Sequence, residues 1–146
     1  MQKENRNISG FHVPYEVRNC ELGLGLFVTA KVQTGSLIWE YKSGVNVKEY
    51  VLEELPAHLE KLGFDAAQRL LVLSPFLGGY CCEILDDGHY MNHSDEPNCK
   101  TRSNLSVYAL RDIDAGEQLF EDYSTFEYPD AYYTLCDKYK VVEDFF

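Results

Sequence analysis

Short runs of β-branched and aromatic residues divide this chain, and they limit its fold more than any other feature. Each run is bounded by Gly, Asn, Asp or Ser, which favour turns. We therefore expect a mainly β protein with several small sheets of short strands and few helices. The runs are FHVPYEVR (11–18), GLFVTA (25–30), SLIWEYK (36–42), GYCCEIL (79–85), LSVYALR (105–111) and QLFEDY (118–123).

Helical spacing replaces this pattern in residues 46–63, where apolar residues follow one side of a helix and acidic residues the other. The sequence therefore predicts an amphipathic helix there, kinked or divided by Pro56, which removes a backbone donor. FDAAQRLLVLS (64–74) is predicted to add a further helical turn. YPDAYYTLCDKY (128–139) is predicted to form a C-terminal helix, with Pro129 near its first turn.

Two stretches of the chain echo each other: VQTGSLI begins at Val32 and IDAGEQL begins at Ile113. Each follows one strand-like run and precedes another. Similar hairpin-like turns are therefore expected, with Gly35 and Gly116 in backbone conformations that a side chain would resist.

The length of 146 residues favours one domain, and no linker or low-complexity segment interrupts it. No apolar run approaches the roughly 20 residues that span a bilayer, and the polar N-terminus does not resemble a signal peptide. The five cysteines are odd in number and include the adjacent pair Cys81 and Cys82. Reduced thiols in an intracellular compartment, cytoplasmic or nuclear, fit this composition best.

The net charge of −11 opposes binding to a phosphate backbone, so direct nucleic-acid binding is not expected, nor is a membrane partner. The same charge would attract a positively charged partner over a long range. It would equally serve only to keep the protein soluble.

A cluster of potential metal ligands lies between residues 81 and 99 and contains Cys81, Cys82, His89, His93 and Cys99. Structural zinc usually takes paired knuckles, whereas adjacent cysteines in a strand point to opposite faces. No metal site is expected. Nucleophilic catalysis by a Cys and His pair has no further support in the sequence.

The segment GLGLF (23–27) contains a G-x-G, but it lacks the third glycine and the following helix of a dinucleotide fingerprint. A strand bulge would explain it, and so would a backbone that must approach a ligand closely.

Three motifs follow one another along the chain: GLG (23–25), NHSDEPN (92–98) and GEQLFEDY (116–123). Together they resemble the SET-domain protein lysine methyltransferases, whose motifs are G-x-G, N-H-S-C-x-P-N and G-E-E-L-x-[FY]-D-Y. The likeness extends from about residue 10 to residue 123. It includes SLIWEY, which is similar to the I-x-E-Y strand of the family, and a helical insert at the expected place.

The resemblance implies a SET-domain (β-clip) fold, in which several small sheets surround a knot-like crossing and a helix ends the chain. Residues 1–146 would form a single SET domain, with a core at about 10–123. The aromatic segment 124–146 would complete the site. The implied cofactor is S-adenosylmethionine.

Carried over residue by residue, the resemblance implies a cofactor site. Asn92 and His93 would bind the cofactor through amide and backbone groups. Gly23, Leu24 and Gly25 would lie against its methionine portion, where a Cβ would hold it off the main chain. Phe126 and Tyr128 are predicted to stack on its adenine.

The resemblance also implies catalytic residues. Tyr123 corresponds to the catalytic tyrosine, and Tyr41 to a second tyrosine that lines the lysine channel. A reference pKa near 10 makes Tyr123 suitable for positioning and electrostatics rather than as a strong base.

The chain departs from the family pattern at several places. Asp95 replaces the cysteine after N-H-S, and the zinc-binding C-x-C-x4-C segment after Tyr123 is missing. Glu121 occupies the position where the family has a Phe or Tyr that governs how many methyl groups are added. A carboxylate there would orient an ammonium but also stabilise it, which opposes methyl transfer. We expect Glu121 to face the amine site or its water.

The predicted function is therefore S-adenosylmethionine-dependent methylation of a lysine in a basic, Lys-rich protein or peptide, such as a histone tail. The alternative is a SET-like module that binds a partner and is catalytically weak or inactive, which Glu121 favours. Acidic residues near the motifs would attract a basic segment: Asp86, Asp87, Asp95, Glu96, Glu121, Asp122, Glu127 and Asp130.

Overall fold

Short strands and three short helices make up the structure, a computed structural model that describes residues 8–141. The strands are β1 (Tyr15–Cys20), β2 (Gly23–Val28), β3 (Leu37–Trp39), β4 (Val47–Tyr50), β5 (Phe76–Leu77), β6 (Tyr80–Ile84), β7 (Asn92–His93), β8 (Cys99–Thr101), β9 (Val107–Ala109) and β10 (Phe120–Glu121). The helices are α1 (Leu55–Leu62), α2 (Phe64–Leu73) and α3 (Asp130–Lys138), and single 3-10 turns form η1 (Asp87–Tyr90) and η2 (Tyr123–Thr125).

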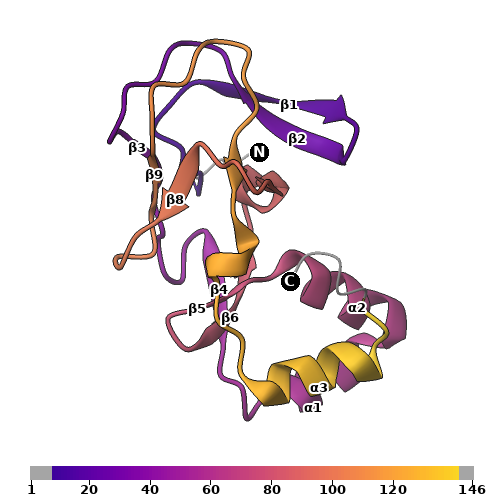
Figure 1. The fold of residues 1–146 in the computed structure, drawn as a ribbon. Coiled ribbons are helices and arrows are strands. Elements are labelled where there is room, and N and C mark those ends of the chain that lie inside the picture. Colours follow the sequence, from indigo (N-terminus) through magenta and orange to yellow (C-terminus); the bar gives the residue numbers. More distant parts are fainter. Residues whose placement is uncertain (1–7, 142–146) are drawn as a thin grey trace, which may run out of the picture.

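The strands pair into small separate sheets, as predicted from the short runs. The pairings are the antiparallel hairpin β1–β2, the sheets β3–β9–β8 and β4–β6–β5, and the parallel pair β7–β10. Figure 1 shows the hairpin and the β3–β9–β8 sheet at one end of the molecule and the three helices at the other. The parallel pair joins segments far apart in the sequence and lies between these two ends.

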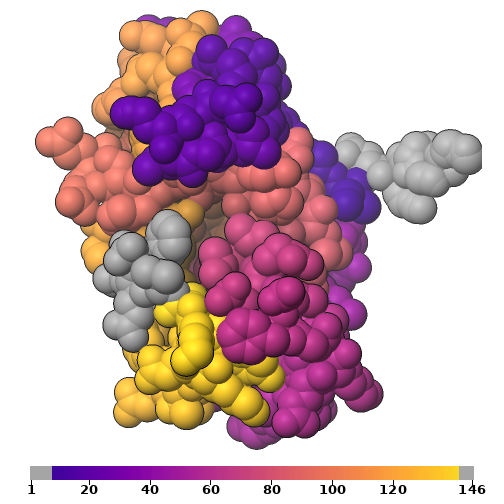
Figure 2. Space-filling model, turned by 90° about the vertical axis from the view of Figure 1, so that its right-hand side faces the viewer, coloured from indigo at the N-terminus to yellow at the C-terminus, as the bar shows by residue number. Residues whose placement is uncertain are grey.

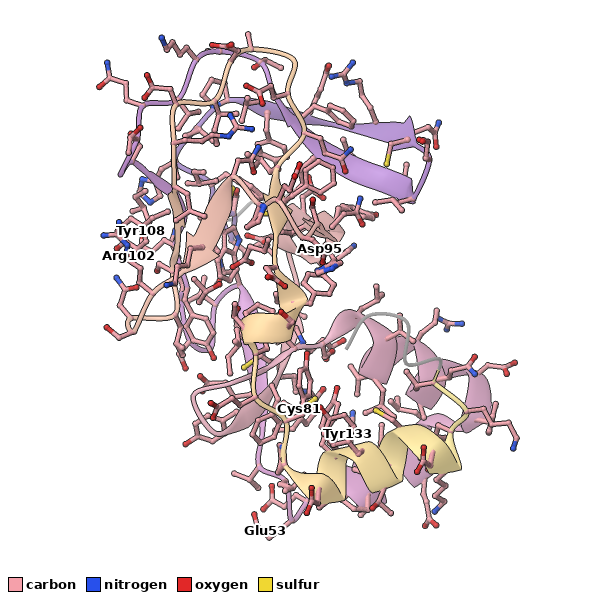
Figure 3. The ribbon with its side chains drawn as sticks, viewed as in Figure 1. Glu53, Cys81, Asp95, Arg102, Tyr108 and Tyr133 are labelled. Carbon is pink, nitrogen blue, oxygen red and sulfur yellow. The ribbon has the colours of Figure 1, made fainter. Side chains whose placement is uncertain are left out.

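Two hydrophobic clusters fill the interior. One gathers residues of the β1–β2 and β3–β9–β8 sheets, including Leu26 and Ile38, and the other packs the three helices around residues such as Tyr132. Adjacent Cys81 and Cys82 belong to different clusters, since successive strand residues point to opposite faces. Figure 3 shows Cys81 on the helical side.

The predicted helix over 46–63 is wrong in its first half. Residues Val47 to Tyr50 form strand β4, which pairs with β6, and α1 begins only at Leu55. Pro56 therefore lies in the first turn of α1, where its missing N–H costs nothing, and it neither kinks nor divides a longer helix.

The other helical predictions are confirmed, with different extents. The expected further turn after residue 63 is the complete ten-residue helix α2. The C-terminal helix α3 begins directly after Pro129. No helix within residues 8–141 is both long and apolar enough to cross a membrane.

The two echoing stretches pair with each other. Val32 and Ile113 exchange two backbone hydrogen bonds of 2.8 Å. Gly35 and Gly116 have φ values of +84° and +93°, so both turns use the left-handed backbone that favours glycine. The two echoing stretches thus form matching turns that are joined to each other by backbone hydrogen bonds.

Candidate active site

The G-x-G segment forms the start of β2, and its residues have different surroundings. Gly23 has a φ of +102°, which explains a glycine at that turn. At Gly25 a Cβ would lie 2.4 Å from the side-chain oxygen of Gln118. The side chain of Gln118 therefore makes the close approach that Gly25 permits. The approach of a cofactor to Gly25 stays a prediction.

Gln118 belongs to a small network of amide groups. The Asn92 amide nitrogen donates to the Leu24 carbonyl at 3.0 Å and to the Gln118 side-chain oxygen at 2.9 Å. These bonds fix the orientation of Asn92 against β2. Sequence reasoning missed Gln118. The signal for it was its place in GEQL (116–119), where the G-E-E-L motif of the family has its second glutamate.

The segments 91–98 and 118–123, called the crossing below, hold each other through backbone and side-chain bonds. β7 and β10 pair in parallel, and the Ser94 N–H donates to the Glu121 carbonyl at 2.9 Å. Asn98 is buried, donates to the Gln118 carbonyl and accepts from the Phe120 N–H, each at 2.8 Å. The crossing therefore brings the second and third motifs together.

His93 lies at the crossing, but its side chain does not line the cavity described below. Its Nδ1 accepts the Tyr123 N–H at 2.9 Å, so Nε2 carries the ring proton and donates to Asp95 at 3.1 Å. The side chain of His93 thus positions Tyr123. The predicted cofactor contact would have to come from its backbone.

Tyr123 is well enclosed by its neighbours. Its hydroxyl donates to the Met91 carbonyl, and its ring stacks on Phe126 with centroids 5.9 Å apart. Burial, with the nearby Glu121, raises the pKa of Tyr123 above its usual range. The hydroxyl therefore stays protonated, and it donates its hydrogen bond to the Met91 carbonyl.

Glu121 is buried, with an exposed fraction of 6%. The Thr101 hydroxyl donates to its Oε2 at 2.5 Å. Burial raises the pKa of this carboxyl, and the hydrogen bonds from Thr101 only partly oppose that shift. The residue that departs from the family pattern is therefore an interior acid.

A cavity of about 390 Å³ joins these features. Its size lies within the range of small-molecule sites. Six predicted site residues line it: Leu24, Asn92, Glu121, Tyr123, Phe126 and Tyr128. The structure thus gathers residues from all three motifs and from the aromatic segment around one space.

Helix α2 supplies a wall of the cavity that sequence reasoning missed. Leu71, Leu73 and Ser74 line it, and the buried Ser74 hydroxyl has no hydrogen-bond partner among the described residues. Figure 2 shows α2, in magenta, below the indigo β1–β2 hairpin, with the salmon segment that contains β7 between them. No local motif marks these α2 residues, because only tertiary packing brings them to the site.

Tyr41, predicted to line the lysine channel, is not among the residues that line the cavity. Its hydroxyl donates to Glu49 at 2.5 Å and lies 3.2 Å from the Cys82 sulfur. Its ring meets Trp39 edge-on, with centroids 6.1 Å apart. These contacts place Tyr41 in the core between β3 and β6, and its role in the channel stays a prediction.

Comparison with protein families decides the relationship that the motifs indicate. The model of the SET domain matches residues 23–124, which include all three motifs and the whole crossing. The chain belongs to the SET-domain family. This family includes the protein lysine methyltransferases that the motifs resemble, and a search of curated proteins found no match.

A solved SET-domain structure confirms the fold class. A structure of ctPRC2 in an autoinhibited conformation bound to S-adenosylmethionine is similar to this chain, with a TM-score of 0.60 and 20% sequence identity. The likeness covers 88% of this chain but only 17% of that chain. At this identity it shows a shared fold, and the chain spans a small part of that protein's length.

Proposed function

We propose that this SET domain is an S-adenosylmethionine-dependent protein lysine N-methyltransferase. The observation that carries the proposal is the convergence of Leu24, Asn92 and Tyr123, one residue from each motif, on a single cavity. The solved structure with this fold is bound to S-adenosylmethionine.

The residues around the cavity suit this cofactor. The Asn92 amide and the Ser74 hydroxyl, which has no partner within residues 8–141, offer polar contacts, while Leu24, Phe126 and Tyr128 offer apolar and aromatic surface. Small-molecule sites commonly combine a few placed polar groups with such walls. Asn92 and Leu24 would hold the methionine portion, and Phe126 and Tyr128 the adenine.

The cofactor supplies an electrophilic methyl group on a sulfonium. The protein's task is then to align a neutral lysine amine in line with that methyl group and to exclude water. The Tyr123 hydroxyl donates its hydrogen bond to the Met91 carbonyl, and a hydroxyl oxygen can accept weak C–H···O contacts from an electron-poor methyl group. Tyr123 therefore positions and stabilises, and its raised pKa argues against a role as base.

A basic protein segment is the proposed substrate. A second hollow, lined in part by Lys100 and Glu127, shares Leu77, Thr101 and Phe126 with the cavity and offers a route for a lysine side chain. Among the acidic residues expected to attract a basic segment, Asp95, Glu96, Glu127 and Asp130 are exposed. Figure 3 shows Asp95 beside the crossing.

Two acidic residues cannot attract a substrate in the way predicted. Asp86 is buried and accepts the Gly10 N–H at 2.7 Å and the Trp39 indole N–H at about 3.0 Å. It anchors the N-terminal segment and the core. Glu121 is also buried. Asp86 and Glu121 therefore do not belong to the acidic surface that was expected to attract a basic segment.

Calorimetry with S-adenosylmethionine, followed by transfer of a radiolabelled methyl group to core histones or poly-lysine, tests the proposal. We expect cofactor binding and lysine methylation, and a loss of at least about tenfold in transfer for Tyr123→Phe with binding retained. Tyr133→Phe, on α3 and outside the cavity lining, is the matched control. A chain that binds no cofactor would contradict the proposal.

The second candidate is a SET-like binding module without activity, which the buried Glu121 favours. Cofactor binding without transfer to any of these proteins, unchanged by Tyr123→Phe, would support this alternative.

A further inference from the structure

The cavity is lined by a buried carboxyl group that neither cofactor binding nor methyl alignment explains. Glu121 is the one carboxylate among the described residues that line it, and Tyr123 lies two positions further along the same wall. Within residues 8–141 the Glu121 carboxyl has no ion-pair partner, and Thr101 provides its hydrogen bonds. An unpaired buried acid costs stability, so its presence at the proposed reaction site requires an explanation.

The groups that face Glu121 would not neutralise it. Cys99 on β8 and Tyr123 both stay protonated, because burial raises the pKa of each. His93 is its register partner across β7–β10, but that ring is directed to Tyr123 and Asp95. His89 is the one histidine among the described residues that line the cavity.

Burial changes the balance between a carboxylate and an ammonium. In water the reference pKa values of Lys and Glu differ by about 6, so the proton stays on nitrogen. Burial lowers the pKa of an amine and raises that of a carboxyl, by as much as about 3–5 for each in documented cases. Those opposite shifts are large enough to close the gap, so an apolar site can favour the neutral pair over the ion pair.

We propose that the Glu121 carboxylate accepts the proton of the substrate ammonium and thereby generates the neutral amine that attacks the methyl group. An N–H bond breaks and leaves its electron pair on nitrogen, while an O–H bond forms on a Glu121 oxygen. The amine then forms the N–C bond, and the C–S electron pair returns to sulfur. The product keeps its positive charge on nitrogen, and Glu121 releases its proton to water.

This inference rests on the proposed methyltransferase function and resolves the difficulty that the sequence raised. A surface carboxylate would hold the ammonium charged, whereas a buried one that prefers to be neutral removes the proton. Thr101 has a positioning role, because its hydroxyl stabilises the charged carboxylate before the substrate enters.

Glu121→Gln is the test variant, since it keeps the size of the side chain and can still bond to Thr101. Glu83→Gln is the matched control, because Glu83 also accepts a hydroxyl bond, from Tyr50 at 2.7 Å, but does not line the cavity. Methyl transfer to core histones is measured between pH 7 and 10, and cofactor binding by calorimetry.

At pH 7 we expect Glu121→Gln to bind cofactor normally but to transfer methyl groups about 10²-fold more slowly. Its rate should then rise about tenfold per pH unit up to pH 9, because lysine must lose its proton to water. The wild type and Glu83→Gln should show a flatter dependence of rate on pH. Thr101→Val removes the hydroxyl that stabilises the charged Glu121 carboxylate. The transfer rate of this variant should therefore begin to fall at a higher pH than the rate of the wild type, as the pH is lowered.

Equal rates and equal pH profiles for the wild type and Glu121→Gln would overturn the inference. So would a Glu121→Gln protein that stays inactive at pH 10, because much of the lysine amine is already neutral there and the loss must have a cause other than proton removal. A wild type that methylates no probe contradicts the proposed function instead. Independently of substrate, a ¹³C NMR titration that finds an ordinary or lowered pKa for the Glu121 carboxyl would also overturn it.

Discussion

Asn98 offers the sharpest test of how the crossing is held. It is buried, and its side chain bonds the Gln118 carbonyl and the Phe120 N–H, each at 2.8 Å. The change to Ala removes both hydrogen bonds at once and leaves the Gln118 carbonyl and the Phe120 N–H without this side chain. A buried polar group left without a partner costs about 1–3 kcal/mol, so with two such groups Asn98→Ala should lose about 2–6 kcal/mol of the free energy of unfolding.

Urea denaturation followed by circular dichroism measures this loss. With a slope near 2 kcal/mol per molar urea, a loss of about 3 kcal/mol lowers the midpoint by about 1.5 M. Domains of this kind have only about 5–15 kcal/mol in total, so the shift is easily detected.

Asn104→Ala is the matched control. The exposed Asn104 also bonds two groups, the Tyr108 hydroxyl at 2.6 Å and the Ser106 N–H at 3.0 Å, but water can replace it. We expect a loss below about 1 kcal/mol there. If the two variants lost the same stability, the reasoning that burial determines the cost would be refuted.

Three further predictions concern the site. Gly25→Ala places a Cβ 2.4 Å from the Gln118 oxygen, which displaces the Gln118 amide and breaks its hydrogen bond with Asn92. Calorimetry should then show cofactor affinity reduced by about tenfold or more. An unchanged affinity would contradict this prediction. Burial raises the pKa of Glu121 above its ordinary 4.5, so its contribution to stability is fully present below pH 4.5 and is lost as pH rises through the folded-state value. Urea titrations should therefore show Glu121→Gln gaining stability relative to wild type above pH 4.5, and a constant difference would argue against a raised pKa. Tyr41→Phe should cost about 1 kcal/mol of stability with transfer within about twofold of wild type, whereas a tenfold slower transfer would favour the predicted channel role.

The sequence predicted the existence of most strands because turn residues bound each run so clearly. It failed at β4, where the spacing of Val47 and Val51 suits a helix equally well. Pairing with β6, which no local pattern reveals, decided the outcome. Pro56 was interpreted as a break within a longer helix, because the sequence did not show that α1 begins only at Leu55.

The lining of the cavity was predictable where a motif residue itself faces it, as Asn92 and Tyr123 do. It was not predictable where a residue acts through another, as Gln118 does on Asn92. Ser74 reaches the cavity only because α2 packs beside the crossing, and neither its neighbours in sequence nor its type indicates that position.

The walls of the cavity come from nearly the whole described chain, from Leu22 on the first hairpin to Val141 after α3. Such a site exists only when all of these segments are folded, so a bound ligand stabilises the entire unit and not a single loop. A ligand at 100 times its dissociation constant adds about 2.7 kcal/mol to the free energy of unfolding. Resistance to proteolysis would then rise at bonds far from the ligand.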